Sequence, residues 1–358
     1  MAELCGHSPV GVPPPLIAGR RPPQYLWGMD YTHLGKSGLV VSRLCLGCMS
    51  YGDPAWRPWV LDETAARPFF RRAIEAGINF FDTADMYSLG RSEEVTGKLL
   101  REFGRLDELV IATKVFFDVR SGAPNMGGLS RKHIVQGCEA SLRRLGVDTI
   151  DLYQLHRFDP EVPLDESLEA LDFLVQQGKV RYLGASTTYG WQLMKALATS
   201  DRLGLARFAS MQNHYNLLYR EEEREMVPLC LDQGLGMIPW SPLARGILAR
   251  ADAAPTGTSR AETDTLTGQL YDHPDDGLVI AANARVAAAR GVSAAETALA
   301  WLLGKPGVSA PIIGVTKLAQ LESALRALTL TLSPDEVAAL EAPYTPRPIR
   351  GWYEGRRA

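Results

Sequence analysis

The stretch NFFDTADMYS, residues 79–88, places ionisable side chains where an apolar run ends. Asp82 closes the run and Tyr87 follows five residues later. Lys114 and His156 stand in the same way at the ends of two later apolar runs, IATK and IDLYQLH. An aspartate, a tyrosine, a lysine and a histidine that converge from neighbouring strands would form an ionisable cluster in a partly buried cup.

The chemistry expected of such a cluster is the protonation of a developing alkoxide. A lysine ammonium beside a phenol favours the phenolate, so Lys114 would lower the pKa of Tyr87. Asp82 would keep Lys114 charged and in place. Tyr87 would then donate a proton near neutral pH, while His156 would hydrogen-bond a substrate carbonyl oxygen. The residue types therefore suggest carbonyl reduction.

Each residue also has a plain structural explanation. Aspartate and threonine favour turns and helix starts, and a single polar residue at a strand end is usually a solvated cap. His156 alone is more often a hydrogen-bonded structural histidine than a catalyst. The second acid of the stretch, Asp85, has no assigned partner, and we interpret it as a solvated loop residue.

The rest of the chain predicts the frame that would position these residues. Short apolar runs alternate with helical periodicities, which is typical of a parallel sheet with helices outside it. Eight such repeats favour a closed α/β fold, the (β/α)8 TIM barrel. The predicted strands are 42–47, 78–82, 109–114, 150–156, 180–186, 208–213, 236–241 and 309–314. The predicted helices are 62–76, 130–145, 163–177, 221–233 and 276–290.

Two further segments complete the predicted barrel. Residues 31–44 suggest a β-hairpin that plugs its N-terminal end. Residues 246–275 interrupt the alternation of strands and helices and suggest a long loop after strand seven. Because active sites of such barrels lie at the C-terminal ends of the strands, this loop is expected over the catalytic end.

A reduction also needs a hydride donor, and the sequence lacks the usual glycine-rich phosphate loops. Other strand ends offer contacts instead: Trp240 presents a flat face to a nicotinamide ring, and Ser186 and Gln212 present polar groups to its carboxamide. Arg245 suits a pyrophosphate, and a helix N-terminus after strand eight suits a phosphate. The predicted cofactor contacts are Ser186, Gln212, Trp240, Ser241, Pro242, Leu243, Arg245, Gly246, Gly314, Thr316, Lys317 and Gln320.

Composition narrows the class of protein. The chain has 358 residues, of which 46% are hydrophobic and 22% charged, with a net charge of −3. These values are ordinary for a soluble globular protein. The sequence has no basic stripe for nucleic acid or an anionic membrane, and no apolar run long enough to cross a bilayer. We therefore expect a small-molecule partner, and the oligomeric state is not predictable.

The termini and the cysteines complete this description. Residues 1–28 predict a flexible Pro/Gly-rich leader without the pattern of a secretory signal. Residues 29–342 would form a single barrel domain, and 343–358 a C-terminal tail. Five scattered cysteines suggest reduced thiols in a cytoplasmic protein. Cys45 and Cys48 form a C-x-x-C, which we interpret as structural because a buried free cysteine acts as a small hydrophobe.

In the motifs that carry these residues, the chain resembles the aldo-keto reductases over residues 30–342. The motifs FFDTADMY, IATK, DLYQLH, GAS, MQNHYNLL, WSPLARG and PIIGVTKLAQLE occur in the order of that family. The resemblance implies a catalytic tetrad of Asp82, Tyr87, Lys114 and His156, and NADP(H) bound extended across the barrel mouth. Two segments look most like a bacterial branch related to aryl-alcohol dehydrogenases, which is similar in turn to potassium-channel β subunits.

The sequence departs from the family pattern at two cofactor positions. Thr316 stands where many members have arginine, and Ala324 stands where many have asparagine, although Gln320 is kept. Lys317 can still meet a 2′-phosphate as a point charge. This favours NADPH over NADH.

The leading expectation is therefore an NADPH-dependent reductase of aldehydes or ketones. One alternative, implied by the channel β subunits, is a regulatory subunit that senses the nicotinamide cofactor with slow or no turnover. A metal-dependent barrel hydrolase is disfavoured because none of the six histidines forms H-x-H or H-E-x-x-H. Candidate pocket residues are Tyr51, Met86, Phe116, Phe117 and Arg157, although core packing explains Phe116 and Phe117 equally well.

Overall fold

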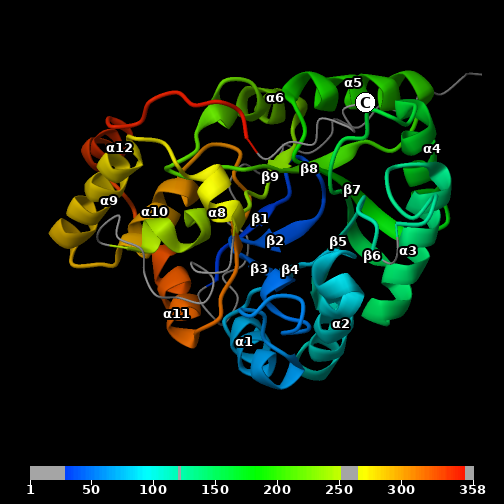
Figure 1. Cartoon of the computed structure of the whole chain (residues 1–358), viewed down its shortest axis with the longest axis horizontal. Coiled ribbons are helices and arrows are strands. Elements are labelled where there is room, and N and C mark those ends of the chain that lie inside the picture. The colour runs from blue at the N-terminus through cyan, green and yellow to red at the C-terminus, as the bar shows by residue number, and fades with distance from the viewer. Residues whose placement is uncertain (1–28, 120–121, 251–264, 351–358) are drawn as a thin grey trace, which may run out of the picture.

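A curled sheet of eight parallel strands forms the centre of the molecule (Figure 1). The structure is a computed structural model that describes residues 29–119, 122–250 and 265–350. The strands run in the order β10-β3-β4-β5-β6-β7-β8-β9. Their bounds are β3 Cys45–Gly47, β4 Phe80–Asp82, β5 Val110–Val115, β6 Ile150–Leu155, β7 Val180–Ser186, β8 Phe208–Gln212, β9 Gly236–Met237 and β10 Ile312–Ile313.

Backbone hydrogen bonds link the two end strands of this sheet. The N–H of Ser309 donates to Met237 O at 2.8 Å, and that of Ile312 donates to Pro239 O at 2.9 Å. The predicted (β/α)8 barrel is therefore confirmed. The last two strands are shorter than predicted because Pro239 and Pro311 have no N–H to give to a strand ladder.

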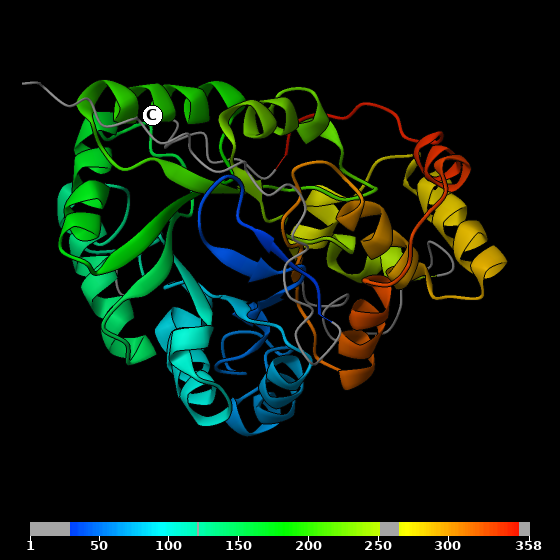
Figure 2. The ribbon, with the colours of Figure 1, turned by 180° about the vertical axis from the view of Figure 1, so that it is seen from behind.

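Helices cover the outside of the sheet (Figures 1 and 2). Their bounds are α1 Glu63–Glu75, α2 Arg91–Phe103, α3 Arg131–Leu145, α4 Leu164–Gln176, α5 Gly190–Leu203, α6 Met226–Gln233, α8 Thr265–Leu270, α9 Asp276–Arg290, α10 Ala294–Leu303, α11 Leu318–Ala327 and α12 Pro334–Glu341. No single helix among the described residues is long and apolar enough to cross a membrane; α9 and α10 reach that length only together, bent by 100°.

Local sequence explains where several helices begin. The side chains of Asp62 and Ser130 accept hydrogen bonds from backbone N–H groups at the starts of α1 and α3, as N-cap residues do. The predicted helix 221–233 divides into a short 3-10 turn, Glu221–Glu223, and α6. Pro228 explains the break, because proline has no N–H to donate and fits only the first turn of a helix.

The predicted hairpin is present at the N-terminal end of the barrel (Figure 2). Its strands β1 (Tyr31–His33) and β2 (Val40–Ser42) pair antiparallel. Leu34, in the turn, is completely buried in an apolar cluster with residues near the starts of the barrel strands, among them Phe80 and Val110. The hairpin thus fills the end of the barrel away from the strand ends that carry the ionisable residues.

Strand register sets the positions of those strand-end residues. Lys114 of β5 is paired with Gln154 of β6, which in turn is paired with Gly184 of β7. A Cβ atom at Gly184 would approach Gln154 Cγ to 2.8 Å, which real Cβ atoms essentially never do. Gly184 therefore leaves the space that the Gln154 side chain occupies.

The described part of the tail, residues 343–350, contacts the body of the protein. Tyr344 OH donates to Glu221 Oε1 at 2.8 Å, and the N–H of Arg347 donates to the same oxygen at 2.8 Å. Arg347 also forms an ion pair with Asp276 of α9. Residues 1–28, expected to be a leader, and the rest of the tail lie outside the described residues.

Candidate active site

The four ionisable residues singled out in the sequence meet at the C-terminal ends of β4, β5 and β6. Lys114 Nζ lies 2.5 Å from Asp82 Oδ2 and 3.4 Å from the hydroxyl oxygen of Tyr87. It also donates to the carbonyl of Thr83 at 2.8 Å. The exposed fractions of the Lys114 and Asp82 side chains are 0% and 3%, so this ion pair is isolated from solvent. The ammonium thus connects the carboxylate to the phenol.

Two glutamine side chains hold the other carboxylate oxygen of Asp82. Gln154 Nε2 donates to Asp82 Oδ1 at 2.9 Å, and Gln212 Nε2 donates to it at 3.0 Å. Gln212 Nε2 also donates to Gln154 Oε1 at 3.0 Å. A buried carboxylate with three donors is strongly stabilised in one orientation. Gln212 therefore lies at the site, with its amide nitrogen bound to the Asp82–Gln154 pair.

Gln154 did not emerge from the sequence as a site residue. It lies two residues before His156, so both side chains project from the same face of β6. A glutamine in an otherwise apolar strand, on the face that carries the histidine, was the available signal. Its function is positional, because it fixes the acid that contacts Lys114.

The backbone conformation after β4 places the Tyr87 side chain next to this cluster. The N–H of Thr83 donates to Ala112 O at 2.9 Å, which extends the pairing with β5 beyond the end of the strand. Ser88 and Leu89 then adopt φ values of 49° and 52°. Left-handed backbone is unfavourable for residues with a side chain. This tight reversal leads the chain directly from Tyr87 into α2.

The expected lowering of the Tyr87 pKa is wrong for the structure. Burial raises the pKa of Tyr87 above its ordinary value, and the charge of Asp82 acts in the same direction. Lys114 does lower the pKa, as expected, but burial outweighs it. The physical reason is that a phenolate loses its hydration in a buried site, while the charge of Lys114 is largely balanced by Asp82. Tyr87 therefore holds its proton at neutral pH.

Lys114 stays charged in spite of its burial. Burial favours the neutral amine, but Asp82 and Tyr87 outweigh this effect and raise the pKa of Lys114. Its Nζ also lies 4.9 Å from the centroid of the Tyr87 ring. The site therefore pairs a permanent cation with a protonated phenol.

His156 is a neutral imidazole beside the phenol. Its ring lies edge-on to Tyr87, with centroids 5.8 Å apart, and edge-on to Phe117 at 5.0 Å. Burial lowers the pKa of His156 well below its ordinary value, and the charges of Arg157 and Lys114 lower it further. Nδ1 is buried and has no hydrogen-bond partner among the described residues. A neutral ring can orient an oxygen by hydrogen bonding without adding a charge.

Asp85 is buried, and its interpretation as a solvated loop residue is wrong. Its exposed fraction is 2%, and its N–H donates to Lys114 O at 3.3 Å, which draws the segment inward. Burial raises the pKa of Asp85 well above its ordinary value, and the carboxylate of Glu93 raises it further. Asp85 thus lies next to a second buried ion pair, in which Arg144 Nε contacts Glu93 Oε2 at 2.6 Å.

Three stacked rings form a flat support next to the tetrad. The His214 ring lies between Trp240, at 4.1 Å and 10°, and Tyr219, at 4.2 Å and 11°. His214 Nε2 is 2.6 Å from the hydroxyl of Tyr271. Trp240 Nε1 donates to Thr187 Oγ1 at 3.2 Å. Trp240 is only partly buried, so a planar ligand can reach it.

Ser186 and Thr187 connect this ring stack to β7. Ser186 Oγ lies 3.2 Å from Thr187 Oγ1, the atom that accepts from Trp240. The N–H of Thr187 donates to Gln212 O at 3.0 Å. Ser186, Gln212 and Trp240, three of the predicted cofactor contacts, are therefore linked by one set of hydrogen bonds.

The predicted phosphate-binding segments lie on the loops after β9 and β10. Within Ser241, Pro242, Leu243, Arg245 and Gly246, three residues have positive φ: 52° at Ser241, 57° at Arg245 and 97° at Gly246. Successive left-handed residues direct backbone N–H groups to one side, as in anion-binding turns. Arg245 Nε donates to Thr267 Oγ1 at 3.1 Å, so part of the segment after β9 packs beside this loop. Residues 251–264 of that segment lie outside the described residues.

After β10 the chain passes through Gly314 to the N-terminus of α11. The backbone N–H groups of Thr316 and Lys317 donate to Gln320 Oε1 at 2.8 and 3.0 Å. Gln320 therefore caps this helix, a role that the sequence analysis did not give it. Lys317 is exposed at the same helix start, where the helix dipole favours an anion.

The predicted pocket residues do not behave alike. Tyr51 is completely buried, packs against Phe69 and Phe70 of α1, and donates to Val315 O at 3.0 Å, so it belongs to the core. Phe117 contacts the His156 ring instead. A tryptophan missed in the sequence, Trp56, has its ring 6.5 Å from that of Tyr87. Aromatic side chains therefore border the phenol on more than one side.

Four of the five cysteines fall within the described residues, and all four are buried free thiols: Cys45, Cys48, Cys138 and Cys230. Burial raises the pKa of Cys48 to about 12. A thiol that does not ionise at neutral pH is a poor nucleophile. This agrees with the structural interpretation of Cys45 and Cys48.

Comparisons with known proteins give one consistent match. A model of the aldo/keto reductase family matches residues 43–344. The chain is 41% identical over 341 residues to versiconal hemiacetal acetate reductase of Aspergillus parasiticus, covering 90% of this chain and 98% of that protein. It is 43% identical over 344 residues to a Schizosaccharomyces pombe protein whose name assigns it provisionally to the aryl-alcohol dehydrogenases, covering 90% and 97%.

A further relative is an aldo-keto reductase of Fusarium vanettenii, 42% identical over 347 residues, covering 90% of this chain and 93% of that protein. The relatives named here are fungal, and they do not support the predicted placement in a bacterial branch.

Proposed function

The chain belongs to the aldo/keto reductase family, and we propose that it reduces an aldehyde or ketone to the alcohol with NADPH as hydride donor and Tyr87 as proton donor. The observation that carries the proposal is the position of Lys114 Nζ between Asp82 and the Tyr87 hydroxyl. A buried, paired ammonium that touches a phenol serves a reaction in which that phenol gives up its proton.

The residues around the site fit a nicotinamide cofactor. Trp240, supported from behind by His214, offers a ring face for stacking. Both N–H groups of the Gln212 amide are used by Asp82 and Gln154, which leaves its carbonyl oxygen for a carboxamide N–H. Arg245 and the N-terminus of α11 suit phosphates. When bound, the cofactor supplies the hydride.

The side chains of the protein supply the proton and its control. Tyr87 is protonated at neutral pH, and it transfers its proton to the oxygen of the carbonyl group as negative charge develops there. Lys114 then stabilises the phenolate that remains, and Asp82 keeps Lys114 in position. His156, as a neutral ring, holds the carbonyl oxygen at the angle that Tyr87 needs. Burial of Asp82, Lys114 and His156, with Tyr87 half-buried beside them, strengthens these electrostatic interactions.

The preference for NADPH rests on one cation. Lys317 is exposed at the start of α11 and can meet a 2′-phosphate as a point charge. We infer that NADPH binds more tightly than NADH, and that Lys317→Ala reduces the difference.

A cofactor-binding and a turnover measurement together test the proposal. The purified chain is titrated with NADPH by following tryptophan fluorescence, and it is then supplied with aryl aldehydes and alicyclic ketones while NADPH absorbance is recorded. Steady oxidation of NADPH that depends on the carbonyl compound is expected. Tight NADPH binding without turnover of any compound would instead favour the cofactor-sensing regulatory subunit.

A further inference from the structure

Arg157 places a second cation next to the tetrad. It follows His156 directly at the end of β6, and its Nη1 donates to the carbonyl oxygen of His156 at 2.6 Å. Its guanidinium carbon lies 5.5 Å from the centroid of the Phe117 ring. Its charge also acts on the Tyr87 hydroxyl and the His156 ring. The guanidinium therefore lies at the substrate end of the site rather than at the phosphate end.

This guanidinium has no carboxylate partner among the described residues. The carboxylates nearest to it in the sequence and in the site are already used. Asp159 accepts from the N–H of Leu129 at 2.8 Å and from that of Glu161 at 2.9 Å. Asp82 is held by Lys114 and two glutamines. Burial lowers the pKa of Arg157 to about 10, and Tyr87 is the ionisable group that counteracts this.

Other partly buried arginines of this chain do have their charges or donors satisfied. Arg144 pairs with Glu93 at 2.6 Å and Arg220 pairs with Glu223 at 2.7 Å. Arg43 interacts with the charge of Asp30 and donates to three backbone carbonyl oxygens. Arg157, by contrast, donates to one carbonyl oxygen, that of His156. A cation that has lost much of its hydration without a partner is costly, so such a residue is ready to bind an anion.

We propose that Arg157 binds a carboxylate group of the substrate, so that the preferred substrates are flat or aromatic carbonyl compounds that carry a carboxylate. The inference rests on the proposed function, because it assigns a substrate group to the same site. A guanidinium recognises a carboxylate through two parallel N–H donors. The aromatic rings of Phe117, Trp56 and Tyr87 lie around this end of the site and can contact the remainder of the substrate. Arg157 is partly exposed, so a ligand can reach it.

The first test compares charged and neutral substrates. kcat/KM is measured at saturating NADPH for the three isomers of carboxybenzaldehyde and for their methyl esters, with wild-type protein, Arg157→Gln and Arg157→Lys. For the best isomer, wild-type protein should prefer the acid over its ester by about 10-fold or more. This preference should disappear in Arg157→Gln and return in part in Arg157→Lys. A matched control is Arg105→Gln, at an exposed arginine paired with Asp107, which should keep the wild-type preference.

A second test does not depend on turnover. Benzoate is titrated into the protein saturated with NADP⁺, and its dissociation constant is compared between wild type and the two Arg157 variants by calorimetry. Weakening by about 10-fold in Arg157→Gln is expected. Equal benzoate affinity in all three proteins would overturn the proposal, as would a loss of kcat/KM in Arg157→Gln that is the same for acids and esters.

The two proposals fail in different ways. Absence of any NADPH-dependent turnover with unchanged tetrad geometry would contradict the proposed reductase, whereas the benzoate titration would still report on Arg157. Turnover with no preference between acids and esters would contradict only the carboxylate site. Melting temperatures of the variants identify any that have lost their fold, and Arg157→Lys serves where Arg157→Gln does not fold.

Discussion

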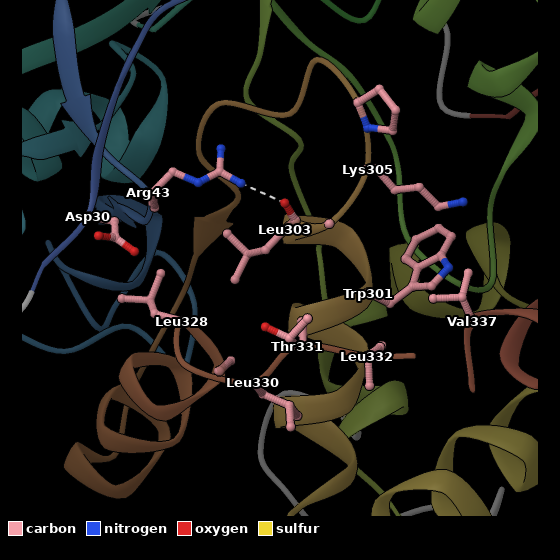
Figure 3. A pocket seen from close by; sticks show the side chains of 14 residues that line it. Asp30, Arg43, Trp301, Leu303, Lys305, Leu328, Leu330, Thr331, Leu332 and Val337 are labelled. Carbon is pink, nitrogen blue, oxygen red and sulfur yellow. Dashed lines mark hydrogen bonds between the residues drawn. The ribbon is translucent and has the colours of Figure 1, made fainter. Parts of the chain in front are cut away.

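The two ends of the barrel differ in what they offer a ligand. The C-terminal mouth concentrates a buried ion pair, two buried amides and a half-buried phenol around Asp82. The N-terminal end instead has a pocket of about 560 Å³ between α10, the segment after α11 and the start of β3 (Figure 3). Its walls are largely aliphatic and include Leu303, Leu328 and Leu332. This pocket and the ionisable cluster are therefore at opposite ends of the barrel.

The two cations that line the N-terminal pocket, Arg43 and Lys305, already have partners within the protein. Arg43 donates to the carbonyl oxygen of Leu303 (Figure 3) and to those of Val308 and Ser309. Lys305 pairs with Glu341 and lies 4.6 Å from the centroid of the Trp301 ring. In the mouth, by contrast, Arg157 and His156 Nδ1 have unused hydrogen-bonding capacity. The cations of the N-terminal pocket are thus occupied by groups of the protein itself, whereas polar groups at the mouth are free to contact a ligand.

Among substitutions at the two ends of the barrel, removal of the Lys114 ammonium should reduce activity and stability most. In Lys114→Met, kcat should fall by about 10³-fold, because the phenolate of Tyr87 loses its cation. Stability should also fall, by about 3–5 kcal/mol, because Asp82 stays buried without its partner. Steady-state kinetics and urea unfolding measure the two effects.

Lys179→Met is the matched control for that variant. Lys179 forms an ion pair with Glu139 near the surface, where such pairs contribute about 0–1 kcal/mol. The control should keep wild-type kcat and nearly wild-type stability. Equal losses of kcat and stability in Lys114→Met and Lys179→Met would contradict the special importance of the buried ion pair.

Removal of His214 should have an intermediate effect at the mouth. His214→Ala deletes the ring stacked behind Trp240, and aromatic pairs contribute about 0.5–1.5 kcal/mol beyond area burial. The Kd for NADPH should therefore rise by about 2- to 10-fold, measured by fluorescence titration. His33→Ala, on the N-terminal hairpin, should leave it unchanged. An unaltered Kd for NADPH in His214→Ala would show that the ring stack does not contribute to cofactor binding.

The pH dependence should be small near neutrality. The pKa of His156 lies well below its ordinary value, and that of Tyr87 lies above its own. His156 is therefore protonated only in acid and Tyr87 loses its proton only in base. kcat/KM for the carbonyl compound at saturating NADPH should be flat from about pH 6 to about pH 9. A limb near neutrality that disappears in His156→Gln would contradict the neutral assignment.

Changes in the N-terminal pocket should have the smallest effect on activity. Leu328→Ala should lower stability by about 1–2 kcal/mol through lost apolar contacts, while kcat/KM changes by less than about twofold. Thermal unfolding and steady-state kinetics on the same preparation measure both. A loss of kcat/KM by an order of magnitude would mean that this pocket takes part in function after all.

The fold was easier to predict from the sequence than the pKa shifts of the buried groups were. Alternating strands and helices indicate the barrel because apolar periodicity reflects which side of an element is buried. The strand ends then indicate which residues meet, and Asp82, Tyr87, Lys114 and His156 do meet. Their catalytic roles and the cofactor contacts stay predictions. Strand lengths were overestimated where Pro239 and Pro311 interrupt the ladder.

Burial explains most of what the sequence did not predict. The direction of the Tyr87 pKa shift depends on how completely the phenol is desolvated, which spacing along a chain does not reveal. Asp85 was misread because polar residues in turns are usually exposed, whereas this turn packs inward under α2. Gln154 was overlooked because it is one polar residue in an apolar run, and its partners Asp82 and Gln212 come from two other strands, β4 and β8.

The most direct test of the proposed reductase compares wild-type protein with Tyr87→Phe. This change removes one hydroxyl oxygen and leaves the ring next to His156 and Lys114. We expect kcat/KM for the carbonyl compound to fall by about 10³-fold or more, while the Kd for NADPH changes by less than about twofold, because the proposed cofactor contacts lie elsewhere. Turnover in Tyr87→Phe at a rate close to that of the wild type would contradict the assignment of Tyr87 as the proton donor.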